Sequence, residues 1–94
     1  MNKSDVIEKL SEQVGVPEQE ASSIVDTILQ SMTQSLVDGE NVEIRGFGSF
    51  TVRHYDSYTG RNPKTGEDTL VKAKKLPFFK VGKELREAVD GGKR

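Results

Sequence analysis

The stretch TGRNPKTG, residues 59–66, gathers side chains that could act on another molecule. Between its two glycines stand Arg61, Asn62, Pro63 and Lys64, four residues of different chemistry, followed by Thr65. Proline presets the second position of a turn and glycine relaxes the exit, so a tight reversal of the chain is expected. Arg and Asn are also residue types that read a nucleic-acid minor groove, and an apolar residue at a tip can wedge between base steps. Two roles follow, a plain turn or a turn that presents Pro63 to a nucleic acid.

The segments that flank this stretch lack the residues needed for a core. From Arg53 to Thr69 there is no Leu, Ile, Val, Phe or Met, although the composition still suits strands. We therefore expect a two-stranded ribbon, about residues 53–75, that extends beyond the core by on the order of 30 Å at roughly 3.3 Å per residue. A two-stranded ribbon alone is marginal in water, so we expect it to be mobile until a partner orders it.

The N-terminal part has the period of helices. Apolar residues recur on one face from a cap at Asn2 or Ser4 to about Val14. A second helix opens after Pro17, keeps its period for roughly twenty residues and is closed by Gly39. Two helices joined by a short link predict a helical hairpin.

The remaining elements predict an α+β fold. Alternation predicts a short strand at 42–44, followed by a turn at 46–48 and a second strand from Ser49. The chain is expected to return to the core at 76–79. A final short helix is expected over 83–89, with Leu85 and Val89 facing inward. We expect one domain over residues 1–90, made of the helical hairpin, a three-stranded antiparallel sheet with the protruding ribbon, and the C-terminal helix. Residues 91–94 are expected to be a disordered tail.

Composition indicates a small core. The 94 residues are 33% hydrophobic and 31% charged, with four Phe and no Trp. A domain of this size is only marginally stable alone, so dimerisation is expected. There is no cysteine, no apolar run that could span a membrane and no apolar signal segment at the start, so we expect no membrane association.

The charges are unevenly distributed. The net charge is only −1, but residues 1–44 hold two basic and nine acidic residues, whereas residues 45–86 hold ten basic and four acidic ones. Such asymmetry can present a positive face on an acidic molecule.

No enzyme site is recognisable. His54 is the single histidine, no cysteine can partner it, and the glycines around Pro63 do not match a phosphate loop. We expect no catalysis, no cofactor, no metal and no small-molecule substrate.

Basic residues interleaved with an aromatic one form the remaining pattern. A narrow basic ribbon fits a nucleic-acid groove, and Lys and Arg both suit phosphates. Free backbone N–H groups near Gly46, Gly48 and Gly82 are expected to add donors. The candidate binding residues are Arg53, Tyr55, Arg61, Asn62, Pro63, Lys64, Lys72, Lys74, Lys75, Lys80, Lys83 and Arg86.

Three segments closely resemble the bacterial histone-like HU and integration host factor family. They are IRGFGSF (44–50), GRNPKTG (60–66) and PFFKVGKELREAV (77–89), and the order of elements is similar over about residues 1–90. The resemblance implies an intertwined dimer that wraps double-stranded DNA with two arms in the minor groove. It implies that Pro63 intercalates and kinks the duplex, with Arg61 and Asn62 beside it.

The family likeness also implies roles for further residues. Phosphate contacts are implied for Lys3, Ser49, Lys72, Lys75, Lys80, Lys83 and Arg86. The stretch EIRGFGSF resembles the beta subunit of integration host factor, which implies that Arg45 reaches the minor groove and Glu43 holds it. The core of the dimer is expected from Ile28, Leu29, Met32, Leu36, Phe47, Phe50 and Phe79.

The expected function is that of an architectural protein of the bacterial cytoplasm and nucleoid, which bends DNA largely without sequence specificity. The alternative is a sequence-preferring subunit in recombination or transcription control, paired with a related chain instead of a copy of itself. Two other classes stay open: a module that adds a strand to a partner sheet, and an RNA binder that stacks Tyr55 and Tyr58 on bases.

The arm departs from the family pattern at residues 55–58. Tyr55, Asp56, Ser57 and Tyr58 stand where more basic residues are usual. Fewer phosphate contacts predict weaker binding and a shallower salt dependence.

Overall fold

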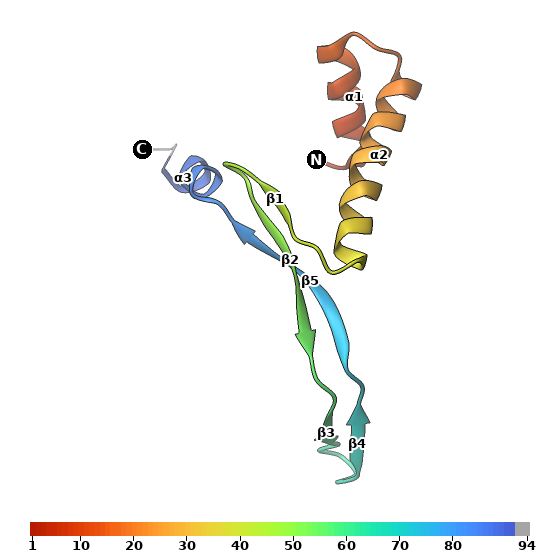
Figure 1. Ribbon diagram of the computed structural model, residues 1–94, viewed down its shortest axis with the longest axis vertical. Coiled ribbons are helices and arrows are strands. Elements are labelled where there is room, and N and C mark those ends of the chain that lie inside the picture. The colour runs from red at the N-terminus through yellow and green to blue at the C-terminus, as the bar shows by residue number, and fades with distance from the viewer. Residues whose placement is uncertain (92–94) are drawn as a thin grey trace.

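A computed structural model describes residues 1–91 as a three-pronged molecule. A helical hairpin, a C-terminal helix and a long arm extend in different directions from a small sheet (Figure 1). The elements are α1 (Lys3–Val14), α2 (Glu18–Val37), β1 (Val42–Ile44), β2 (Gly48–Tyr55), β3 (Tyr58–Arg61), β4 (Asp68–Val71), β5 (Lys74–Val81) and α3 (Lys83–Gly91).

The helical hairpin has well-defined ends. Of the two caps that the sequence allowed, Asn2 is the one used: its Oδ1 accepts from the Asp5 N–H at 2.9 Å, and Asp5 Oδ2 accepts from the Asn2 N–H at 3.0 Å. Gly15 ends α1 in the left-handed conformation, with φ of 78°. Pro17 immediately precedes α2, whose first turn carries acids that the helix dipole favours.

The sheet has the strand order β1-β2-β5 and is antiparallel, as expected. Gly48 of β2 is buried, and the space that a side chain would need there is occupied by the ring of Phe79 in β5. The C-terminal helix is anchored to the turn between β1 and β2, because the Leu85 N–H donates to the Gly46 carbonyl at 3.1 Å. This helix runs to Gly91, so the predicted tail was wrong at that residue, and the rest of the tail, 92–94, lies outside the described residues.

Very little of the single chain is buried. Within residues 1–91, Ala21 and Val25 are the only buried hydrophobic side chains, and Val89, expected to face inward, is 72% exposed. The radius of gyration is 19.4 Å, against about 12 Å for a compact domain of this length. The chain therefore has the shape of one partner in a larger assembly.

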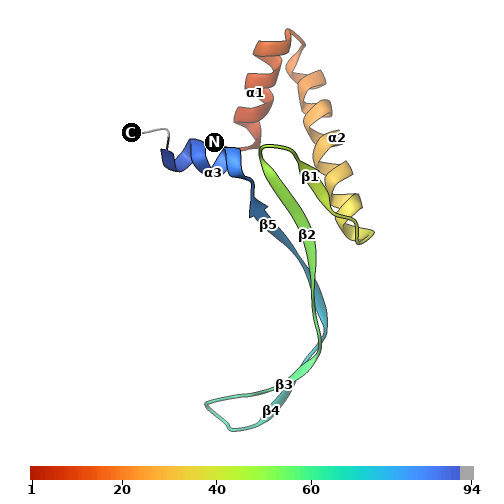
Figure 2. The ribbon, with the colours of Figure 1, turned by 60° about the vertical axis from the view of Figure 1, so that its left-hand side comes forward.

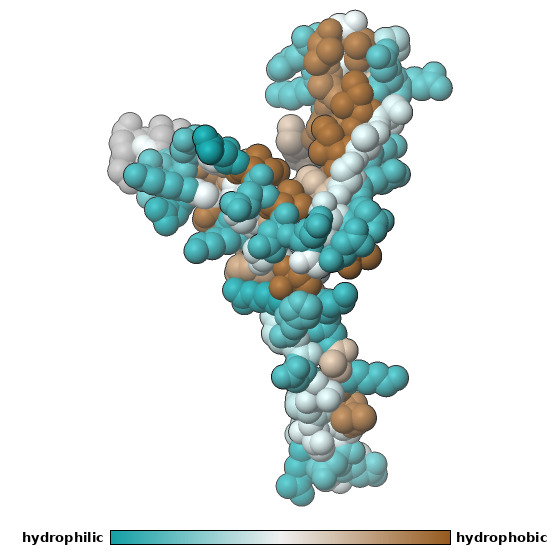
Figure 3. All heavy atoms as spheres, in the orientation of Figure 1, coloured by the Kyte–Doolittle hydropathy of each residue, from teal (hydrophilic) through white to brown (hydrophobic). Residues whose placement is uncertain are grey.

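The residues expected in a dimer core are still accessible. Figure 3 shows apolar side chains gathered on the helical hairpin and beside it on the sheet, while most of the arm is hydrophilic. Ile28, Leu29, Phe47 and Phe79 are between 38% and 54% exposed. The other three predicted core residues, Met32, Leu36 and Phe50, are half-buried. An apolar surface of this extent is typical of a face that another chain covers.

The predicted ribbon is present, and it is one continuous hairpin. The pairing Tyr55↔Lys74 at the end of β2 and the pairing Tyr58↔Val71 at the start of β3 belong to the same register. Strand pairing lapses only at residues 56–57 and 72–73, which divides the ladder into two sheets. The distal part, β3 and β4, curves away from the line of β2 and β5 in Figure 2.

A small apolar contact stabilises this distal part. A methyl group built on Gly60 would lie 3.7 Å from the Tyr58 ring and 3.7 Å from a methyl group of Val71. Val71 is the residue that pairs with Tyr58 across the ribbon. The Tyr58 ring thus covers the gap that a glycine leaves in a strand. Tyr58 therefore has a structural role in the arm.

Candidate nucleic-acid interface

The tip of the arm is closed by its own hydrogen bonds. The Asn62 N–H donates to the Glu67 carbonyl at 2.8 Å, and the Gly66 N–H donates to the Asn62 carbonyl at 2.7 Å. The Asn62 side-chain oxygen also accepts from the Lys64 N–H at 2.9 Å, which fixes the turn around the exposed Pro63. Turn chemistry therefore accounts for the reversal, and its result is a hydrogen-bonded tip that presents Pro63 to solvent.

The two expected groove-reading residues are partly engaged within this tip. Arg61 Nε donates to the Gly66 carbonyl at 3.2 Å, although the register partner of Arg61 is the acidic Asp68. The terminal guanidinium nitrogens of Arg61 and the amide nitrogen of Asn62 have no hydrogen bond among the described residues. The tip therefore keeps unused donors on the two residues that precede Pro63. Its hydrogen bonds also hold the turn in shape before binding, which lowers the ordering cost of binding.

Strand register assigns the basic residues of the ribbon to faces. Residues directly opposite one another share a face, and successive residues alternate. The face that carries Arg53, here called the Arg53 face, comprises Ser49, Thr51, Arg53 and Tyr55 of β2 with Lys74, Leu76, Phe78 and Lys80 of β5. Lys75 pairs with His54 and lies on the opposite face. The predicted binding residues of the ribbon base thus gather on one face, with Lys75 as the exception.

The other predicted cations lie on segments next to this part of the sheet in the sequence. Arg45 is exposed in the turn after β1, Lys72 is exposed between β4 and β5, and Lys83 and Arg86 lie in the first turn of α3. A hollow on the Arg53 face is lined by Asn41, Glu43, Ser49, Thr51, Arg53, Phe78 and Lys80. Glu43 places a carboxylate there, beside its register partner Ser49.

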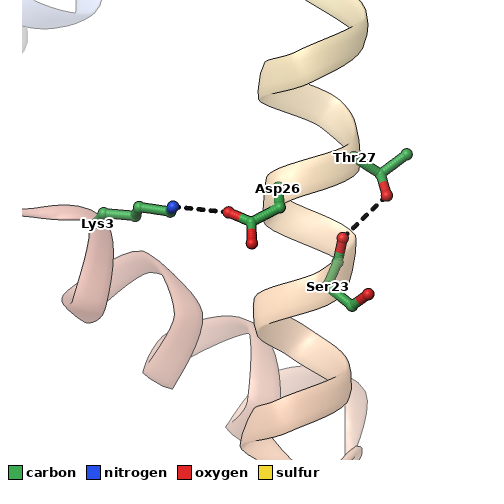
Figure 4. Close-up of polar contacts among 4 residues, drawn as sticks. All are labelled: Lys3, Ser23, Asp26 and Thr27. Carbon is green, nitrogen blue, oxygen red and sulfur yellow. Dashed lines mark hydrogen bonds and ion pairs between the residues drawn. The ribbon is translucent and has the colours of Figure 1, made fainter.

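Lys3 is the one predicted contact that is occupied by an ion pair. Its ammonium lies 2.6 Å from a carboxylate oxygen of Asp26 on α2 (Figure 4). The two side chains are 56% and 43% exposed, so solvent screens this pair and it is weak. Lys3 can therefore leave Asp26 for a phosphate at small cost.

Two expectations about the turns around β1 and α3 fail. No ion pair joins Glu43 and Arg45 in the described part of the chain, because Arg45 lies past the end of β1 and the alternation that would align them has ended. The Gly82 N–H was expected to be free, but it donates to the Phe47 carbonyl at 2.9 Å.

Phe78 and Asn41 are site residues that the sequence reasoning missed. The run Pro77-Phe78-Phe79 was interpreted as a return to the core, whereas alternation from the core residue Phe79 places Phe78 on the Arg53 face. Counting register back from the turn would have revealed this.

Within residues 1–91 no helix is long and apolar enough to cross a membrane.

Comparison with known proteins identifies the family. The family described as "Bacterial DNA-binding protein" matches residues 1–90. The chain is 48% identical over 91 residues to integration host factor subunit beta of Haemophilus influenzae (strain PittGG), covering 96% of this chain and 97% of that one. It is 45% identical over 89 residues to DNA-binding protein HU of Staphylococcus aureus (strain COL), covering 95% and 99%.

A solved structure supports the same assignment. The Anabaena HU–DNA cocrystal structure superposes with a TM-score of 0.82 and 34% identity, over 95% of this chain and 97% of that one. The chain therefore belongs to the bacterial DNA-binding protein family, with HU and the integration host factor subunits.

Proposed function

We propose that this chain is an architectural protein that binds double-stranded DNA as a dimer and bends it. The observation that carries the proposal is the arm: a curved basic ribbon that ends in a closed, exposed tip with Pro63 at the turn. A ribbon of this width enters a minor groove, and an apolar ring at its end can wedge between adjacent base pairs. The relative that superposes over nearly its whole length was crystallised with DNA.

The binding surface comprises three groups of residues. Pro63 intercalates, with Arg61, Asn62 and Lys64 in the groove beside it. Phosphates are held by the Arg53 face, by the arm and by the start of α3. The residues proposed for these contacts are Lys3, Arg45, Ser49, Arg53, Tyr55, Lys72, Lys74, Lys75, Lys80, Lys83 and Arg86. Chemistry on a substrate has no part in this function, and its place in the cell is the bacterial cytoplasm and nucleoid.

Dimerisation completes the body. The exposed apolar side chains of the hairpin and sheet need a cover, and a second chain of the same shape supplies one. In the dimer, two arms extend from one body, so that two kinks can be made in one duplex. The domain proposed for this role spans residues 1–90, with its arm at about 53–75.

A second candidate is a sequence-preferring subunit that pairs with a related chain. The relative at 48% identity is named as a subunit, and Glu43 and Arg45 line one hollow next to Ser49 and Gly82. In this alternative, the exposed Arg45 in the turn after β1 reads a groove. Competition between a selected site and random duplexes decides the matter, because equal affinity excludes a preference.

Binding to linear, nicked and pre-bent duplexes across a salt series tests the proposal. An architectural protein prefers the nicked and pre-bent forms, because their bending costs less. Affinity should fall as the salt concentration rises, because phosphate contacts release counterions, although less steeply than for an arm with more basic residues. Binding that hardly responds to salt would indicate strand addition to a protein partner, and a preference for single-stranded RNA would indicate the RNA role.

Substitution of Asp26 by Asn is expected to tighten duplex binding about threefold at low salt, because Lys3 no longer has a competing carboxylate. Fluorescence anisotropy with a labelled duplex measures the effect. The Asp26→Asn change in a Lys3→Ala background is the control and should leave affinity unchanged. Equal tightening in both backgrounds would show that net charge alone, and not the Lys3 pair, was responsible.

A further inference from the structure

The ring of Phe78 is placed against a cation on the outer surface of the sheet. Phe78 is 38% exposed and pairs with Thr51 on the Arg53 face. The guanidinium carbon of Arg53 lies 3.4 Å from the centre of the Phe78 ring. The other two phenylalanines of β2 and β5, Phe50 and Phe79, are in contact with each other on the opposite face, with ring centres 4.8 Å apart.

This contact leaves the hydrogen-bonding edge of Arg53 unused. A guanidinium stacked on a ring keeps its planar fork of N–H donors free for an anion. Arg53 has no hydrogen bond and no ion pair with any residue that the structure describes. In this respect it differs from Lys3, which is held by Asp26, and from Arg61, which donates to Gly66.

The ligand that fits this arrangement is a phosphate of the duplex backbone. Thr51 lines the same hollow as Arg53 and is the preceding β2 residue on the Arg53 face, so one hydroxyl is available beside the guanidinium. The carboxylate of Glu43 lies beside Ser49, which precedes Arg53 by four residues along β2, roughly 13 Å for an extended strand. The Arg53 end of the hollow is thus the end that suits an anion.

We propose that Phe78 is a positioning residue for Arg53, and that the stacked pair forms a preordered clamp for one phosphate of the DNA backbone. The inference rests on the proposed DNA-binding function. A free arginine loses side-chain freedom when it binds a phosphate, whereas Arg53 has already lost some of that freedom to the Phe78 ring. The clamp is independent of sequence, because phosphates carry no base identity.

A double-mutant cycle on a mixed-sequence linear duplex tests the clamp. Arg53→Gln should weaken binding and lower the slope of log affinity against log salt by about one per lost phosphate contact. Phe78→Leu, which keeps an apolar side chain without a π face, should weaken binding about threefold per chain and leave the slope nearly unchanged. In the Arg53→Gln background, Phe78→Leu should cause no further loss.

Rescue and control variants separate positioning from support of the fold. Phe78→Tyr retains the ring and should bind like the parent protein, and Phe78→Met should behave like Phe78→Leu. Tyr58→Leu removes an arm aromatic that is remote from the clamp, so its effect should add to that of Arg53→Gln. Thermal unfolding of each variant identifies any loss that comes from instability.

Two results would overturn the clamp. One is an equal loss from Phe78→Leu with and without Arg53, and the other is a Phe78→Tyr variant that binds no better than Phe78→Leu. A parent protein that shows no salt-dependent duplex binding would remove the proposed function itself and the clamp with it. If the parent binds and the cycle is additive, the function stands and only the clamp is rejected.

Discussion

Replacement of Pro63 by Ala is expected to leave a protein that still binds DNA but bends it far less. The tip should keep its shape, because its hydrogen bonds run between Asn62, Lys64, Gly66 and Glu67 and none uses the proline ring. The variant loses the apolar wedge. In the parent protein this wedge offsets the free-energy cost of unstacking a base step, which is on the order of a few kcal/mol. Affinity for an intact duplex should fall about tenfold.

The same variant should bind nearly normally to a duplex that is nicked at the kink positions, since there the unstacking cost is small. Band-shift titrations on intact and nicked duplexes measure the ratio. Pro63→Leu, which keeps an apolar wedge, should restore most of the affinity for intact DNA. Pro17→Ala, at an exposed proline before α2, is the matched control and should change neither value. An unchanged ratio for Pro63→Ala would show that the proline serves only the turn.

The largest expected loss of stability comes from Gly48→Ala. The new methyl group would lie 2.6 Å from the Phe79 ring and 2.7 Å from the Lys80 carbonyl oxygen. The ring could move, but the carbonyl belongs to the backbone of β5 and can move only if the pairing of β2 with β5 is disturbed. Overpacking of this kind destabilises by about 3 kcal/mol.

Urea unfolding at fixed protein concentration measures this loss. Gly60→Ala is the matched control: it also lies in a strand, and no atom comes closer than 3.7 Å to the added methyl group. Its free energy of unfolding should stay within about 0.5 kcal/mol of the parent value. Similar losses for both variants would mean that the close approach of Gly48 to β5 is not the cause of the lost stability.

Local signals in the sequence predicted most of the fold. The cap at Asn2, the glycine at 15 and the change from helical to alternating period fixed the helices and the first strand, because each acts within a few residues. The arm was predicted because residues 53–69 contain no Leu, Ile, Val, Phe or Met, and a segment without large apolar residues cannot be buried. The end of α3 was harder, because Gly91 is a weak helix former that the structure nevertheless includes in the helix.

Contacts between distant residues could not be predicted. Lys3 and Asp26 are far apart in sequence and meet only because the hairpin folds α1 against α2. Phe78 was assigned to the core because it adjoins Phe79, and only the strand register separates the two faces. Val89 was expected to face inward, but it is largely exposed in the single chain. Whether such a residue is buried in a dimer depends on the surface of the second chain, which a pattern of neighbouring residues does not reveal.

The structure explains in part why residues 55–58 can lack the basic side chains that were expected there. Tyr58 covers Gly60 and pairs across the ribbon with Val71, so an aromatic side chain supports the distal arm at a position without a charge. Tyr55 lies on the Arg53 face opposite Lys74, where it can contact sugars. The predicted weaker and less salt-dependent binding stays a prediction, as does the mobility of the free arm. For Asp56, which lies where the strand pairing lapses, we have no physical account.

The central claim is that this protein bends DNA, and the distance between the ends of a bound duplex tests it most directly. Energy transfer between dyes on the two ends of a linear duplex should rise as the protein saturates it, because two kinks draw the ends together. The rise should be reduced with Pro63→Ala at the same saturation. Saturated binding by the parent protein with no change in the end-to-end distance would contradict the account.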